Sequence, residues 1–248
     1  MSGLLIGVGV GPGDPELITL KAVRVLGTAD AVLVPVMAGN EQETGRAEAT
    51  VLAHVPADRV LRVPFALNDR GGVTAGREQA WDAAAHAVLA AFDRGAATVA
   101  FATIGDPNIY STFGYLAQTV RGLRPDVAVR TVPGITAMQD LAARSGTVLV
   151  EGRESLTLMP ITAGVEAFDA ALAGRGTVVA YKGWRRTHGM VEALRRHDRL
   201  DLAVSGERLG LPDERIGPLA DTPLTHTALP YLSTVLVPAR RGRRGEKL

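Results

Sequence analysis

The segment from Leu4 to Leu17 constrains the fold of this chain more than any other. It opens with the apolar run Leu4–Val8, which is typical of a buried strand. Four glycines lie between positions 7 and 13, and Asp-Pro-Glu at 14–16 then predicts a helix start with Asp14 as its N-cap. Glycine lets the backbone approach a bound molecule closely. A strand, a glycine-rich turn and a helix in this order therefore predict an α/β fold with a small-molecule site at the turn.

The spacing of these glycines does not fit two common nucleotide sites. A Gly-x-Gly-x-x-Gly frame that starts at Gly7 places Pro12 at its third glycine, and one that starts at Gly9 places Asp14 there. The next predicted strand carries no acidic residue for a ribose, and Gly-Lys-Ser/Thr occurs nowhere in the chain. A nicotinamide dehydrogenase and a P-loop enzyme are thus disfavoured. A tight turn that holds no ligand stays open as an interpretation.

Apolar periodicity predicts alternating strands and helices along the whole chain. We expect strands at 4–8, 31–34, 59–63, 98–103, 127–132, 155–159, 177–181 and 202–205, and helices at 16–26, 46–54, 74–94, 112–123, 137–144, 165–173 and 187–197. The stretch 231–237 reads as an edge hairpin because proline-rich sequence precedes it. A linker at 122–126 predicts an N-terminal domain 1–124 and a C-terminal domain 125–248. The expected class is two α/β domains with mixed, mostly parallel sheets around a cleft.

Composition narrows the function classes. The chain of 248 residues has 46% apolar residues, no cysteine and a net charge of +1. We expect no disulfide, no membrane contact and no nucleic-acid partner, and a cytoplasmic location fits the missing cysteines. The five histidines show no metal-ligand spacing, so no metal is expected. The basic end at 240–247 reads as a solvated tail or as a contact with an acidic ligand or a partner subunit.

Four motifs, in chain order, resemble those of the tetrapyrrole (corrin and porphyrin) methylases, which use S-adenosylmethionine. The motifs are Gly11-Pro12-Gly13-Asp14, Gly105-Asp106-Pro107, Pro133-Gly134-Ile135-Thr136 and Tyr181-Lys182-Gly183. Ala137 stands where the family often has serine, and Trp184 departs from the Gly-Gly-Arg that some members carry. The resemblance implies S-adenosylmethionine as cofactor, S-adenosylhomocysteine as product, and a homodimer. It places the cofactor at Pro12, Ile104, Gly105, Asp106, Ile109, Thr136, Ala137 and Lys182.

Further segments resemble one branch of that family. Asn68-Asp69-Arg70 resembles a segment of members that act on precorrin-2. The segments 110–113, 210–214 and 230–234 resemble members that methylate C20 of this tetrapyrrole in cobalamin biosynthesis. By placement alone, Asp14, Asp106 and Tyr110 are the candidates for a catalytic base. The substrate carries many carboxylates, which predicts contacts from Lys21, Arg70 and Arg185, although each also reads as a solvated surface charge.

Several alternatives remain at this level. One is methylation at another ring position or of cobalt-precorrin-2. Another is an RNA methyltransferase of the same fold, which the net charge of +1 disfavours. A non-catalytic tetrapyrrole carrier that kept the pocket is an alternative of a different class.

Overall fold

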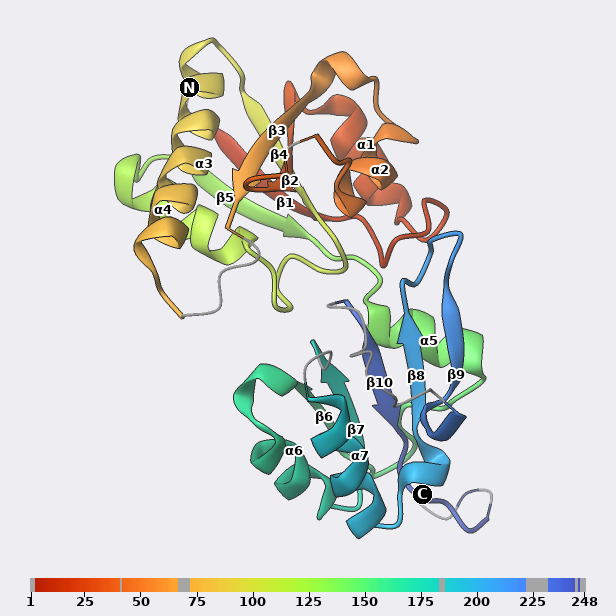
Figure 1. Cartoon of the computed structure of the whole chain (residues 1–248). Helices are drawn as coiled ribbons and strands as arrows, with labels where there is room; N and C mark the ends of the chain where they lie inside the picture. Colours follow the sequence, from red (N-terminus) through yellow and green to blue (C-terminus); the bar gives the residue numbers. More distant parts are fainter. Residues whose placement is uncertain are drawn as a thin grey trace. The chain divides into compact units, whose positions relative to one another are not determined.

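The computed structural model describes residues 3–40, 42–66, 72–182, 186–221, 232–243 and 245. The chain divides into two compact units, Met1–Thr136 and Ala137–Leu248, each of which combines a five-stranded sheet with helices (Figure 1). Two α/β units match the expected class. The division falls after Thr136, whereas the sequence suggested a linker that ends the first domain at residue 124.

The sheet of the first unit is parallel throughout. Its strand order is β3-β2-β4-β1-β5, and each neighbouring pair runs parallel. Parallel strands covered by helices are buried on both faces, and β1 and β4 are accordingly almost continuous apolar runs. The strands are β1 (Leu4–Gly9), β2 (Ala31–Met37), β3 (Val60–Phe65), β4 (Thr98–Thr103) and β5 (Ala128–Val132).

Strand β5 is the reason why the first unit is longer than the sequence suggested. The segment 127–132 was expected to open the second domain. Instead β5 pairs with β1 over Leu4–Val8, and so it completes the first sheet. The polar turn before β5 looks like a linker in sequence, but it only carries the chain back to the far side of β1.

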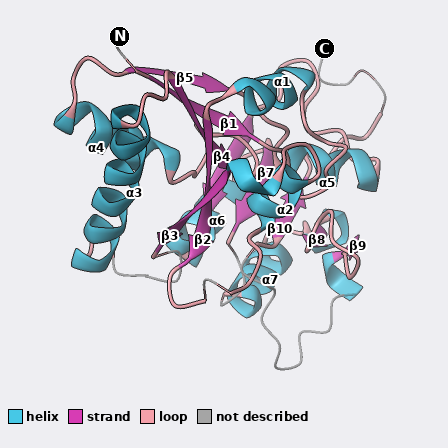
Figure 2. Cartoon of the chain, turned by 90° about the horizontal axis from the view of Figure 1, so that it is seen from above, coloured by secondary structure: helices cyan, strands magenta, loops and turns pink. Residues whose placement is uncertain are grey.

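Two pairs of helices cover the two faces of this sheet (Figure 2). Leu5 and Phe101 point to the face where α3 and α4 pack, whereas Ile6 and Val8 point to the face of α1 and α2. This alternation along β1 follows from the two-residue period of a strand. The helices are α1 (Leu20–Thr28), α2 (Arg46–Leu52), α3 (Ala75–Asp93) and α4 (Phe113–Leu123), with a short 3-10 turn at Ala57–Arg59.

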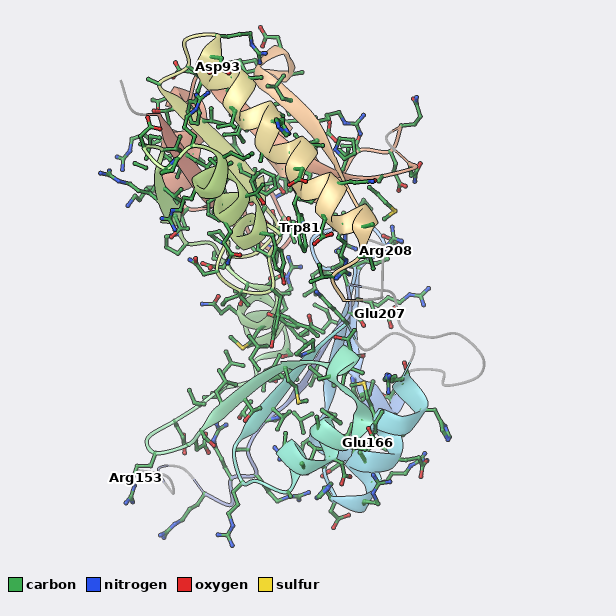
Figure 3. The ribbon with its side chains drawn as sticks, turned by 90° about the vertical axis from the view of Figure 1, so that its left-hand side faces the viewer. Trp81, Asp93, Arg153, Glu166, Glu207 and Arg208 are labelled. Carbon is green, nitrogen blue, oxygen red and sulfur yellow. The ribbon has the colours of Figure 1, made fainter. Side chains whose placement is uncertain are left out.

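Helix α3 begins close to where the sequence predicted it, with Thr74 as its N-cap. Trp81 in its second turn stacks on Tyr115 of α4, with the ring centroids 4.4 Å apart. Figure 3 labels Trp81 and, at the end of the same helix, Asp93. Asp93 forms an ion pair of 2.6 Å with Arg124 just after α4, so the α3–α4 pair is joined at both ends.

The second unit holds a mixed sheet of order β6-β7-β10-β8-β9. Only β6 and β7 run parallel, and the other three neighbouring pairs are antiparallel, which differs from the mostly parallel sheet expected here. Helices α6 and α7 pack on one face and α5 on the other. The strands are β6 (Leu156–Pro160), β7 (Thr177–Tyr181), β8 (Val204–Glu207), β9 (Arg215–Pro218) and β10 (Thr234–Val237), and the helices are α5 (Ala137–Ser145), α6 (Val165–Leu172) and α7 (Thr187–Arg196), with 3-10 turns at Ile161–Ala163, Leu200–Leu202 and Leu219–Asp221.

The last strand contradicts the expected edge hairpin. Strand β10 lies between β7 and β8, and all four of its residues are buried. Its continuous apolar, β-branched sequence is that of a central strand covered on both faces. The edge beyond β8 is instead taken by β9, which the sequence did not predict. Among the described residues, no helix has the length and apolar character needed to cross a lipid bilayer.

Candidate functional site

Three glycines contact one another at the carboxyl ends of β1, β4 and β5: Gly9 ends β1, Gly105 lies in the loop after β4, and Gly134 lies in the loop after β5. A Cβ atom on Gly9 would lie 2.5 Å from the carbonyl oxygen of Gly105 and 2.6 Å from the backbone nitrogen of Gly134. A Cβ on Gly134 would lie 2.1 Å from the same oxygen of Gly105. The absence of side chains at Gly9 and Gly134 therefore lets the three backbones meet. The glycine loop suggested that backbone comes close to a bound molecule. At Gly9 and Gly134, the backbone instead comes close to other backbone.

The glycine loop also pairs with the loop that follows β4. The backbone N–H of Gly105 donates to the carbonyl oxygen of Gly11 at 2.7 Å, and the N–H of Val10 donates to Thr103 at 3.0 Å. Gly11 has φ = +83°, and a Cβ there would lie 2.3 Å from the carbonyl oxygen of Leu17. Only glycine combines this backbone with this space. Pro12, the next residue, is buried in the fixed loop.

Asp106 uses both carboxylate oxygens to brace these loops. Its side chain is buried, with 9% of the residue exposed. Oδ2 accepts the backbone N–H of Gly134 at 3.0 Å, and Oδ1 accepts that of Asn108 at 2.8 Å. Hydrogen bonds to a carboxylate are stronger than those between neutral groups, so Asp106 holds the loop after β4 to the loop after β5.

Asp14 caps a turn rather than a helix. Its Oδ1 accepts the N–H of Glu16 at 2.9 Å, and α1 starts at Leu20 with Thr19 as its N-cap, so the helix expected at 16–26 begins later than predicted. The reason is local. The hydroxyl of Thr19 accepts the N–H of Ala22 at 3.1 Å and caps the helix. The Asp-Pro-Glu segment instead forms a turn, within which the Asp14 side chain binds the N–H of Glu16. Asp14 is half-buried next to the glycine loop.

Tyr110 has a strained backbone in the loop between β4 and α4. Its φ is +49°, a left-handed value that is rare for a bulky residue and is concentrated at functional sites. Partial burial raises the pKa of the Tyr110 phenol above its ordinary value. The phenol therefore stays protonated near neutral pH and is suited to donate a hydrogen bond rather than to remove a proton. The neighbouring Ser111 anchors the loop, because its hydroxyl bonds that of Thr103 at 2.9 Å.

The position that a Gly105 side chain would occupy is open. This residue has φ = +66°, and a Cβ there would meet only the Cα of Thr136, at 4.0 Å. In contrast to Gly9 and Gly134, the missing side chain of Gly105 is not replaced by packed backbone. Ile104 and Ile109, in the same loop, are partly exposed, and Thr136 is buried. In the first unit the structure thus brings together Pro12 and the five predicted cofactor residues after β4 and β5.

The two predicted cofactor residues of the second unit, Ala137 and Lys182, lie on segments that a hydrogen bond joins. Ala137 is the first residue of α5, and Lys182 follows the end of β7 with φ = +61°. The hydroxyl oxygen of Tyr181 accepts the backbone N–H of Met138 at 3.0 Å. This bond ties the start of α5 to the end of β7.

Of the three predicted substrate residues, only one lies in the described part of the chain. Lys21 is exposed in the first turn of α1. Arg70 and Arg185 lie outside the described residues, as does the segment Asn68-Asp69-Arg70. Within the described ranges, no group of three or more histidine, aspartate or glutamate side chains could hold a metal ion.

Sequence reasoning missed the roles of Gly9, Gly134 and Tyr181. A partial signal for the glycines was present, because each follows a predicted strand. The strand at 127–132 was expected in the second domain, however, and only its pairing with β1 brings Gly9 and Gly134 to the same edge of one sheet. No local signal marked the Tyr181 hydroxyl, because Met138 is 43 residues away in the chain.

Comparisons with known proteins agree with this architecture. The chain is 34% identical over 247 residues to the precorrin-2 C(20)-methyltransferase of a Sinorhizobium species, covering 97% of each chain. It is 30% identical over 238 residues to the cobalt-precorrin-2 C(20)-methyltransferase of Salmonella typhimurium, covering 96% of this chain and 97% of that one. The structure of uroporphyrin-III C-methyl transferase from Thermus thermophilus complexed with S-adenyl homocysteine has 25% identity and a TM-score of 0.64, over 95% of this chain and 97% of that one.

The family match spans both units. Residues 4–222 match the tetrapyrrole (corrin/porphyrin) methylases, from the first strand of the parallel sheet to beyond β9 of the mixed sheet. All four motifs that the sequence pointed to lie within this range. This chain belongs to the tetrapyrrole (corrin/porphyrin) methylase family.

Proposed function

We propose that this chain transfers a methyl group from S-adenosylmethionine to C20 of precorrin-2, giving precorrin-3A in cobalamin biosynthesis. The observation that carries the proposal is the 34% identity, over 97% of both chains, to a relative named for that reaction. A match over the full length includes both sheets and all the loops at their carboxyl ends, where sites in such folds lie.

The residues of the first unit fit S-adenosylmethionine. The position of a Gly105 side chain next to Thr136 is open, and the partly exposed Ile104 and Ile109 offer apolar surface and backbone groups. Pro12 is buried in the adjoining glycine loop. When bound, the cofactor supplies a sulfonium-activated methyl group, which is already a good electrophile. The protein then has to hold donor and acceptor carbon in line and to exclude water.

In the second unit, we assign Ala137 and Lys182 to the same cofactor. The left-handed backbone of Lys182 is the kind of strained conformation that folds retain at ligand sites. A solved relative that holds S-adenyl homocysteine supports the choice of cofactor.

For removal of the C20 proton after methyl transfer, we propose Asp14 as the base. Both carboxylate oxygens of Asp106 accept backbone N–H groups, and the Tyr110 phenol stays protonated near neutral pH. Asp14 is the remaining candidate of the three; it is half-buried beside the glycine loop, and its Oδ1 accepts the N–H of Glu16. We assign Asp106 to bracing the loops that hold the cofactor.

We keep Lys21, Arg70 and Arg185 as proposed partners of the substrate carboxylates. Guanidinium groups match carboxylates in a two-pronged geometry, and an ammonium acts as a point charge. Of the three, Lys21 is exposed on α1 and accessible to a charged ligand.

Cobalt-precorrin-2 is the second candidate substrate, favoured by the full-length similarity to the Salmonella typhimurium relative named for it. The deciding experiment is an anaerobic incubation of the protein with S-adenosylmethionine and either the metal-free or the cobalt-containing ring. Mass spectrometry should show one added methyl, and NMR with a labelled methyl should place it at C20.

Each result of this experiment has a distinct meaning. A methyl on the metal-free ring supports the main proposal, and a methyl only on the cobalt form supports the second. A methyl at another ring carbon overturns the assignment of C20. Binding of the ring without release of S-adenosylhomocysteine would identify a tetrapyrrole carrier instead.

We also propose that the protein works as a homodimer in the cytoplasm, as the family resemblance and the biosynthetic names of its relatives suggest. Light scattering after size-exclusion chromatography tests the dimer: a mass near 52 kDa, twice the 26.0 kDa of one chain, is expected. A mass of one chain at micromolar concentration contradicts it. Fractionation of producing cells tests the location.

A further inference from the structure

Tyr181 ends the buried strand β7 and points to the face of the sheet on which α5 packs. Along β7, Val178 and Ala180 belong to the core under α6 and α7, whereas Val179 and Tyr181 pack with α5. The half-buried ring of Tyr181 lies in the same apolar cluster as Ala137 and Met138. The phenol is therefore held next to the first turn of that helix.

The hydroxyl of Tyr181 satisfies a helix N–H from a distant part of the chain. Met138 is the second residue of α5, and the first N–H groups of a helix have no acceptor within it. The Tyr181 oxygen accepts this N–H at 3.0 Å. The two residues are 43 positions apart in the sequence, so the bond joins the start of α5 to the end of β7 across a large part of the unit.

Both joined segments border residues that we assign to the cofactor. Ala137 directly precedes Met138, and Lys182 directly follows Tyr181. Lys182 has φ = +61°, a conformation that costs free energy for a residue with a side chain. Such a backbone persists only where its surroundings fix it, and the bond from Tyr181 fixes the strand end one residue earlier.

We propose that Tyr181 is a positioning residue for S-adenosylmethionine, acting through its hydroxyl bond to Met138. The bond sets the first turn of α5 and the residue after β7 in one arrangement before the cofactor binds. Preorganisation of this kind raises affinity because less ordering remains to be done on binding. The inference rests on the proposed function and adds to it a residue that need not touch the ligand.

The test compares Tyr181→Phe with Tyr115→Phe. The first substitution removes only the accepting oxygen, and the second removes a hydroxyl from a ring that keeps its stacking on Trp81. Calorimetric titration with S-adenosylhomocysteine should give a Kd about 5- to 10-fold higher for Tyr181→Phe and unchanged for Tyr115→Phe, as expected for one lost hydrogen bond. At saturating S-adenosylmethionine, kcat should stay within about two-fold, so that the loss is in KM.

Amide hydrogen exchange separates positioning from simple helix capping. The Met138 amide should exchange about 10-fold faster in Tyr181→Phe than in the wild type. Faster exchange with an unchanged Kd would mean that Tyr181 only caps α5, and this overturns the proposal. Rapid exchange of the Met138 amide in the wild type also overturns the proposal. If the variant does not fold, this wild-type measurement is the one that tests the proposal.

Failure of the proposed function gives a different pattern. Wild-type protein that does not bind S-adenosylhomocysteine, with Met138 still protected, overturns the cofactor assignment itself, and the positioning proposal fails with it. Normal wild-type binding with an equal Kd in Tyr181→Phe overturns the positioning proposal alone.

Discussion

The carboxylate oxygen Oδ2 of Asp106 accepts the backbone N–H of Gly134 at 3.0 Å. This bond joins the loop after β4 to the loop after β5, across the carboxyl end of β1, which lies between these strands in the sheet. The Gly-Asp-Pro turn supplies the carboxylate of this contact, and the Pro-Gly-Ile-Thr turn supplies its N–H.

Replacing Asp106 by alanine should therefore destabilise the first unit. Each backbone N–H left without its acceptor costs about 1–3 kcal/mol, and the substitution affects those of Asn108 and Gly134. Urea denaturation measures the free energy of unfolding, with the exposed Asp58→Ala as the control. Weaker binding of S-adenosylhomocysteine should accompany the loss. A stability equal to that of the control would show that the carboxylate does not brace the loops.

Gly134→Ala should be more damaging than its small size suggests. The new Cβ would lie 2.1 Å from the carbonyl oxygen of Gly105, so backbone must move, at a cost of at least about 2 kcal/mol. Gly27→Ala is the matched control, because a Cβ there meets nothing within 4 Å. Since Gly27 lies within α1, the control should stabilise the protein by up to about 1 kcal/mol. Equal melting temperatures for the two variants would contradict the three-glycine contact.

Asp14→Asn should slow turnover more than it weakens cofactor binding. Asparagine keeps a side-chain oxygen for the N–H of Glu16, so the turn survives, but it cannot take up a proton. If Asp14 is the base, kcat should fall about 100-fold or more, while the Kd for S-adenosylhomocysteine stays close to that of the wild type. Single-turnover kinetics and calorimetry measure the two quantities. An equal loss of both would instead assign Asp14 to cofactor binding.

Lys182→Gly should separate stability from binding. Glycine accepts φ = +61° without strain, so the variant should be as stable as the wild type or more stable by about 1 kcal/mol. Its affinity for S-adenosylhomocysteine should nevertheless fall, because the proposed contact is lost. Asp198→Gly relieves a similar backbone angle of +57° just after α7 and should leave affinity unchanged. Undiminished affinity in Lys182→Gly would remove this residue from the proposed site.

The contact between Asp169 and α7 should make stability depend on pH. The hydrogen bond from Arg196, at 2.7 Å, is the main cause that lowers the pKa of Asp169, and His197 adds to it. A carboxylate with a lowered folded-state pKa stabilises the protein above its unfolded pKa and loses that contribution as the pH falls through the folded value. The melting temperature of the wild type should thus exceed that of Asp169→Asn at pH 7, and the gap should close in acid. A gap that persists at pH 2 would rule out this ion pair as its source.

Local sequence determined most of the secondary structure. The strand at 98–103 and the strand at 177–181 were predicted with the bounds they have, and the periodic helix at 74–94 differs by one residue at each end. In these segments the hydrophobic pattern, the cap residues and the terminating glycines are all local, so no knowledge of distant partners was needed. The motifs that indicate the family are local in the same sense.

Tertiary structure decided where the strands lie in their sheets. Strand β10 and strand β5 were each recognised as strands, yet one proved central rather than at an edge and the other joined the first sheet. Which strand pairs with which depends on the surfaces that distant segments bury together, and the period of a strand carries no information about its neighbour.

In the candidate site, too, some features were predicted from the sequence and others became visible only in the fold. The glycine loop was predicted from the sequence itself, because close approach of the backbone requires glycine, which can be recognised in place. Asp106 and Lys182 were predicted from the resemblance of their motifs to those of a family. Only the fold could show that Asp106 binds Gly134 and that Tyr181 binds Met138, 28 and 43 residues away. A hydrogen bond needs two atoms about 3 Å apart, and for residues this far apart in sequence that distance is set by how the sheets and helices pack.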